Sequence, residues 1–170
     1  MKKRWIALFM VICIMLIHFS DAVAFAEEES QYTISSPYVY PVQPGTTEWL
    51  SLPSVVERRA ACDVPTDVLT GLTTYALAET VVTYPFITDI LCFNSFEQGL
   101  QWVSHYYSGI DELLSRTDAI DCLREYLVNE EDFFAECSEI ALEERTREES
   151  GKYSAYIIAR LMTQYLEEEK

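Results

Sequence analysis

The sequence predicts an all-α protein: a single compact domain of about seven short-to-medium helices behind a flexible linker. From residue 51 onward, apolar residues recur at spacings of three and four, which places them on one face of successive helices. Helix start and stop signals separate these stretches, and no strand signal of weight is present. We therefore expect a signal peptide over residues 1–26, an acidic, proline-containing linker over 27–47 and a helical domain over 48–170.

The first 26 residues have the pattern of a secretory signal peptide. Three basic residues at 2–4 precede an apolar run of 14 residues at 6–19, and Ala24-x-Ala26 supplies a small-residue cleavage site. As a helix the run would extend about 21 Å, which is short for a membrane span. We therefore expect cleavage after Ala26 rather than an N-terminal anchor, and a secreted or extracytoplasmic location at the cell envelope.

Residues 27–47 have the composition of a linker. Three glutamates open the segment, and three prolines are spaced through it among Ser, Thr, Gln and Tyr. Prolines at this density favour an extended, semi-rigid chain over a helix. The tyrosines Tyr32, Tyr38 and Tyr40 leave open docking on the domain or on a partner, but we expect a simple tail.

Capping and stop residues mark the first helices of the domain. Ser54-x-x-Glu57 is a capping box that begins a helix ending near Cys62. A short turn over 66–69 follows. The next helix is predicted over 74–84, because it combines a broad apolar arc with a polar face.

Pro85 ends that helix and suits the first turn of the next one, which is predicted over 86–93. Three residues of this helix align on one face and are expected in the core: Phe86, Ile90 and Phe93. A second capping box, Ser95-x-x-Gln98, begins a helix over 96–107 with a clear apolar stripe.

The rest of the chain is predicted as one turn over 110–114, a helix over 118–128 and two longer helices over 131–149 and 152–168. Gly151 separates the last two helices, since glycine commonly ends a helix. The final helix is apolar over more than half of its circumference, so we expect it to pack centrally.

The charge balance restricts the classes of partner. The chain carries a net charge of −16, and after the predicted cleavage nine of its 12 Lys and Arg and 27 of its 28 Asp and Glu remain, which gives −18. Such an excess repels the phosphates of nucleic acids and anionic membrane surfaces. We expect an unknown protein or cationic partner, no nucleic acid, and no membrane span after cleavage, because no later apolar stretch is long enough.

Four cysteines remain after cleavage, and their even number permits three disulfide pairings outside the cytoplasm. The helices over 118–128 and 131–149 are joined by a short turn near Asn129, which predicts an antiparallel hairpin. Cys122 and Cys137 lie equally far from that turn. We therefore expect these two cysteines to be neighbours, and to form a disulfide if the compartment oxidises.

We assign no catalytic, cofactor-binding or metal-binding residue. His105, the single histidine after cleavage, falls on the solvent side of its helix, so a Cys–His pair would need another element to cover it. The cysteines lack the short spacing of a zinc site. Residues 129–132 hold the densest group of oxygen ligands, but they are better interpreted as acidic residues that begin a helix than as a calcium site.

Aromatic residues on the helix over 96–107 are the remaining indication of a site. Trp102, Gly99 and Tyr106 lie beside its main apolar stripe. Because glycine lets another backbone or a ligand approach closely, this face could be one wall of a binding groove. Helix packing explains the same pattern, and we favour packing.

The segment from Trp49 to about Leu123 carries a more specific pattern. It consists of Trp49, Glu57-Arg58-Arg59-Ala60-Ala61-Cys62, Pro65, Leu72-Thr73-Thr74, Leu77-x-Glu79-Thr80, Tyr84-Pro85, Asp89-Ile90-Leu91, Phe93-Asn94, Gly99 and Gly109-x-x-Glu112-Leu113-Leu114-x-Arg116-x-Asp118-Ala119. In these residues the chain resembles an uncharacterised group of exported, helical bacterial proteins of unknown function. The resemblance covers about half of the mature chain, implies export and a helical fold, and transfers no functional residue.

These observations predict an exported acidic helical protein that acts as a non-enzymatic interaction or binding module at or outside the cell envelope. Two alternatives stay open: a small secreted hydrolase that uses paired carboxylates, and a carrier for a small apolar ligand. The hydrolase requires acidic pairs with raised pKa values in a cleft, and the carrier requires an internal cavity. The binding module requires an exposed apolar or aromatic patch.

Overall fold

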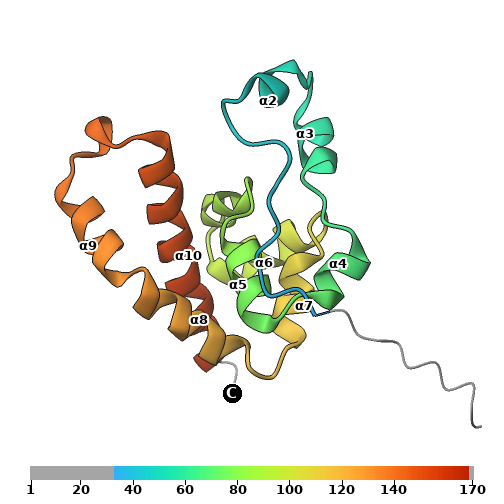
Figure 1. Cartoon of the computed structure of the whole chain (residues 1–170), viewed down its shortest axis with the longest axis vertical. Helices are drawn as coiled ribbons and strands as arrows, with labels where there is room; N and C mark the ends of the chain where they lie inside the picture. Colours follow the sequence, from blue (N-terminus) through green and yellow to red (C-terminus); the bar gives the residue numbers. More distant parts are fainter. Residues whose placement is uncertain (1–32, 169–170) are drawn as a thin grey trace, which may run out of the picture. The chain divides into compact units, whose positions relative to one another are not determined.

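Nine α-helices and two 3-10 helices follow one another in the part of the chain that the computed structural model describes, residues 33–168 (Figure 1). The prediction of an all-α fold is confirmed for this part. The predicted signal peptide and its cleavage site lie outside the described residues. Within residues 33–168, no helix is both long and apolar enough to span a bilayer.

The helices are short until the last one. They are α2 (Thr47–Ser51), α3 (Val55–Ala61), α4 (Thr66–Gly71), α5 (Thr74–Val82), η1 (Ile87–Cys92), α6 (Phe96–Ser104), α7 (Gly109–Ser115), α8 (Ala119–Asn129), α9 (Glu131–Glu139), η2 (Leu142–Glu144) and α10 (Arg147–Glu168).

Side-chain caps begin several of these helices where the sequence predicts them. At α3 the capping box is complete: Ser54 Oγ accepts the Glu57 N–H at 3.2 Å, and the Ser54 N–H donates to Glu57 Oε2 at 3.0 Å. At α6 Ser95 accepts the N–H of Gln98 at 3.2 Å, which is one half of the predicted box. Each cap satisfies an N–H group that the helix itself leaves without an acceptor.

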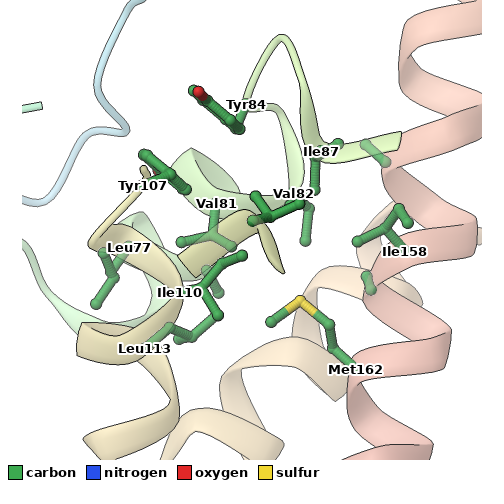
Figure 2. Packing of buried hydrophobic residues seen from close by; sticks show 14 of the residues in the cluster. Leu77, Val81, Val82, Tyr84, Ile87, Tyr107, Ile110, Leu113, Ile158 and Met162 are labelled. Atoms are coloured by element: carbon green, nitrogen blue, oxygen red, sulfur yellow. The ribbon is translucent and has the colours of Figure 1, made fainter. Parts of the chain in front are cut away.

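Helix α5 lies at the centre of the core. Its buried face meets α7, α8 and α10, and Figure 2 shows side chains of α7 and α10 converging on it. The buried residues labelled there include Leu77, Val81 and Val82 from α5, Ile110 and Leu113 from α7, and Ile158 and Met162 from α10. The last helix therefore packs centrally, as its broad apolar face predicts.

The predicted boundary at Gly151 is wrong. Helix α9 ends at Glu139, and α10 runs without a break through Gly151 to Glu168. Its start is fixed by a capping box that the sequence analysis missed: Thr146 Oγ1 accepts the Glu149 N–H at 3.2 Å, and the Thr146 N–H donates to Glu149 Oε2 at 2.7 Å. The hydrogen bond from the Thr146 backbone N–H to the carboxylate is the largest cause that lowers the pKa of Glu149. The capping box at Thr146 therefore starts the helix before Gly151, and the helix continues through that glycine because one glycine lowers helix stability by only about 1 kcal/mol.

The segment predicted as a helix over 86–93 is a 3-10 helix, and this changes which residues are buried. Phe86 and Ile90 are buried as predicted, but Phe93 is 37 % exposed, so its placement in the core is wrong. With three residues per turn, Ile87 shares the buried side with Ile90. Phe93 follows the helix in an extended conformation.

Residues 33–46, which we call the strap, correct the linker prediction. Ile34 forms a parallel β-bridge with Leu72, in which the Ile34 N–H donates to the Gly71 carbonyl at 2.8 Å. Further along the strap, Tyr40 is 5 % exposed and belongs to the core. The chain from Thr33 onward is part of the same compact unit as the helices. Apolar and hydrogen-bonded contacts therefore replace the expected tail in this part.

The predicted hairpin between the helices that carry Cys122 and Cys137 is not formed. One residue, Glu130, is both the C-cap of α8 and the N-cap of α9. Figure 1 shows α9 leading away from α8, while α10 returns beside both helices. Cys122 and Cys137 are free thiols in this structure, half-buried and buried respectively, and a disulfide between them in an oxidising compartment stays a prediction.

Candidate functional site

The structure separates the roles of the three residues that the sequence analysis grouped on α6. Gly99 is buried against η1, and a Cβ atom there would overlap the carbonyl oxygen of Ile90 and lie 2.8 Å from its carbonyl carbon. Gly99 therefore lets η1 and α6 approach each other closely, as the packing interpretation predicts. This contact fixes how η1 and α6 lie relative to each other, and so where the side chains on these two elements are placed.

Exposed apolar side chains on η1, on the residue that follows it and on α6 form an aromatic patch. We define it as Leu91, Phe93 and Trp102. Leu91 and Trp102 are each 51 % exposed, and the rings of Phe93 and Trp102 lie 5.7 Å apart. Ile90 and Val103, on the opposite sides of the same two elements, are buried. The patch is therefore held on a packed base and still presents large apolar side chains to solvent.

Arg59, Asp89 and Tyr106 form a cluster around one ion pair, and Tyr106 lies in the turn after α6, four residues beyond Trp102. The Arg59 guanidinium lies 3.9 Å from the Tyr106 ring centre and 5.4 Å from that of Phe86. Arg59 Nη2 and the Tyr106 hydroxyl donate to the same oxygen of Asp89, at 2.9 Å and 3.2 Å. Burial raises the pKa of Tyr106 to about 12, so its hydroxyl remains a donor at neutral pH. The cluster joins α3 to η1 and to the turn that follows α6.

A cluster of tyrosines lies deeper and connects the strap to the core. Tyr84 and Tyr107 stack with parallel rings 3.9 Å apart, and the hydroxyls of Tyr40 and Tyr107 are hydrogen-bonded at 2.7 Å. Tyr40 donates to the carbonyl of Thr80 at 2.9 Å, so Tyr107 donates to Tyr40. Burial raises the pKa of all three phenols, which keeps them neutral. The cluster therefore acts as a structural support.

The buried thiol beside these tyrosines is not an activated nucleophile. Cys62 donates to the carbonyl of Val42 at 3.4 Å, and burial raises the pKa of its thiol to about 11. A nucleophilic cysteine needs a lowered pKa and a nearby base. His105 instead lies on the solvent side of α6, as predicted, and contacts the carbonyl of Gln101 on its own helix.

We expect the four described cysteines to differ sharply in reactivity. At pH 8 a thiol with a pKa of about 11 is roughly 0.1 % thiolate, whereas an ordinary exposed thiol is roughly a quarter ionised. Brief alkylation followed by peptide mass spectrometry should therefore label the exposed Cys92 first, and the buried Cys62 and Cys137 only after denaturation. Equal labelling of Cys62 and Cys92 in the native protein would contradict the burial of Cys62.

Two carboxylates interact electrostatically: Glu79 of α5 and Glu130 at the junction of α8 and α9. Burial, and next the charge of Glu130, raise the pKa of Glu79. The Tyr126 hydroxyl lies near both groups, and its pKa is also raised, mainly by burial. Acidic residues at the start of α9 occupy its first turn, as predicted for 131–132. In the described part of the chain, no three His, Cys, Asp or Glu side chains are grouped so that they could hold a metal ion.

Comparison of the chain with models of protein families, with curated proteins and with solved structures gives no match. The candidate site therefore depends on the geometry of the aromatic patch.

Proposed function

We propose that this chain is an exported, non-enzymatic binding module that uses the aromatic patch to hold a partner protein. The observation that carries this proposal is the neighbouring, exposed pair Phe93 and Trp102, with the exposed Leu91 on the adjoining element η1. Large apolar side chains gathered on one surface are typical of interaction sites, and tryptophan is enriched among the residues that dominate binding energy.

The charge of the protein narrows the class of partner. A net charge of −16 disfavours nucleic acids, anionic membranes and close approach of a second copy of this chain. A cationic protein would be attracted to the surface and could then cover the aromatic patch. The location at or outside the cell envelope is supported by the predicted signal peptide alone.

The hydrolase alternative has one observation in its favour, the pair formed by Glu79 and Glu130 with the raised pKa of Glu79. A carboxylic acid that stays protonated at higher pH is suited to general acid catalysis. Neither glutamate belongs to the aromatic patch. A Glu79→Gln variant therefore separates the two functions: it should retain all partner binding and would lose any hydrolytic activity.

The proposed function is tested by capturing partners from the exported fraction of the source culture with immobilised protein. We expect Trp102→Ala to weaken binding of the captured protein by about 30-fold, since truncating a central interface tryptophan costs about 2 kcal/mol or more. Leu142→Ala is the matched control, because Leu142 is 74 % exposed on η2 and lies outside the patch. Unchanged thermal unfolding should show that both variants are folded.

Two results would contradict the proposal. One is a partner that Trp102→Ala binds as tightly as the wild type does. The other is the absence of any protein captured specifically by the wild type from the exported fraction.

A further inference from the structure

A second recessed surface lies where the start of α6 meets the end of α10. It is a cleft of about 290 Å³. Phe96 and Tyr165 line it from the two helices, with ring centres 6.1 Å apart and planes inclined at 57°. The aliphatic side chain of Leu161 contributes a further apolar wall. Aromatic and aliphatic side chains therefore form the apolar part of the lining.

Two carboxylates complete the cleft, one from each helix. Glu97 accepts a hydrogen bond from Gln101 at 3.2 Å, and Glu168 accepts one from Gln164 at 3.0 Å. Neither carboxylate forms an ion pair with a Lys or Arg between residues 33 and 168. The nearby Arg124 is already paired, with Glu167 at 2.6 Å and Asp121 at 3.2 Å. The cleft thus combines two carboxylates with two aromatic rings.

We propose that this cleft binds an organic cation, an ammonium or guanidinium group carried on an aliphatic stem. Aromatic rings such as Phe96 and Tyr165 attract a cation through their quadrupoles, and the carboxylates of Glu97 and Glu168 can accept charge-assisted hydrogen bonds from it. Leu161 can cover the hydrocarbon stem. A metal ion is a poorer match, since no metal-binding group of three ligands is found in residues 33–168.

Position along the chain connects this cleft to the aromatic patch. Phe93 of the patch is followed within two residues by Ser95, which lines the cleft, and then by Phe96. A partner that covers the patch can therefore place a lysine or arginine side chain in the cleft. Insertion of a partner's side chain into the cleft rests on the proposed function, whereas binding of a free organic cation does not.

The cleft is tested by NMR titration of the 15N-labelled protein with the N-acetyl amides of lysine and arginine. We expect saturable shifts of backbone amides at residues 95–98 and 161–168, with a dissociation constant on the order of 1 mM, as befits a ligand of this size. The N-acetyl amide of norleucine, which keeps the aliphatic stem but lacks the charge, should cause no comparable shifts.

A matched pair of double variants separates a specific site from general attraction to an acidic protein. Glu97→Gln combined with Glu168→Gln should weaken binding at least about tenfold, because both charged acceptors are lost. Glu139→Gln combined with Glu143→Gln changes the net charge equally but lies on exposed residues of α9 and η2, toward the opposite end of α10 (Figure 1). Equal weakening in both double variants, or shifts spread over the whole acidic surface, would overturn the proposal.

A peptide in which lysine is flanked by leucines distinguishes the two sources of the cation. If it binds at least tenfold more tightly than the lysine amide, and Trp102→Ala removes that gain, the cleft receives a side chain of a partner that also covers the patch. If there is no gain, the cleft is a site for a free cation. If the amides and the peptide cause no saturable shifts, the cleft proposal fails, while partner capture that depends on Trp102 would still support the proposed function.

Discussion

Replacing Tyr40 by alanine is expected to lower the free energy of unfolding by about 3–5 kcal/mol, the range for truncating a large buried aromatic side chain. Tyr40 is 5 % exposed, and its ring lies 5.4 Å from that of Tyr38 and 5.7 Å from that of Tyr84. The substitution removes these contacts and leaves a cavity between the strap and α5. Chemical denaturation followed by circular dichroism measures the change.

The hydroxyl of Tyr40 should account for a separate part of this stability. Burial raises its pKa far above the usual value of a phenol, so it stays protonated and donates to the carbonyl of Thr80. Tyr40→Phe keeps the ring but removes this bond and the acceptor for Tyr107. We expect a loss of about 1–3 kcal/mol, because buried partners are left unsatisfied.

Val39→Ala is the control for the strap, since Val39 is 77 % exposed and adjacent to Tyr40. It should change stability by no more than about 0.5 kcal/mol. A loss below about 1 kcal/mol for Tyr40→Ala would show that the strap is the detachable tail that its composition predicts.

A methyl group added at Gly99 should also destabilise the protein, by about 1–3 kcal/mol. In Gly99→Ala the new Cβ would overlap the backbone of Ile90, and a backbone carbonyl cannot rotate away as a flexible side chain can. Because α6 and η1 would be pushed apart, the Phe93–Trp102 contact should loosen as well. Denaturant melts measure the first effect, and the fluorescence emission of Trp102 reports the second.

Gly151→Ala is the matched control, because it makes the same substitution inside another helix. A Cβ at Gly151 meets nothing within 4 Å, and the residue lies in the first two turns of α10. Since alanine favours a helix more than glycine does, we expect a gain of about 0.5–1 kcal/mol. The same sign for both variants would contradict the packing of η1 on α6.

Local signals predict the helices of this protein well because their causes are local. The capping box at Ser54 needs only a hydroxyl and a carboxylate three residues apart, and it is found as predicted. The box at Thr146 follows the same rule and was available in the sequence. The boundary predicted at Gly151 is wrong because that box was overlooked.

Which side of an element is buried was harder to predict. Phe93 aligns with Phe86 and Ile90 if one α-helix runs over 86–93, but the helix ends at Cys92, and Phe93 follows it in an extended conformation and is 37 % exposed. The sequence analysis therefore placed in the core a residue that forms part of the candidate site. It correctly singled out Trp102 and Tyr106, yet their roles differ: Trp102 is exposed, and Tyr106 is tied to Asp89 and Arg59.

By itself the sequence determined the all-α class, most helix starts and the acidic surface, because periodicity, capping and charge are properties of neighbouring residues. The tertiary structure alone decided that the strap belongs to the domain, because Tyr40 finds its partners some 40 and 67 positions away. It also decided that α8 and α9 do not form a hairpin around Cys122 and Cys137, since the direction of a helix after a one-residue junction is set by what it packs against. The aromatic patch and the cleft have the same origin: each joins side chains of two elements whose approach depends on contacts between those elements.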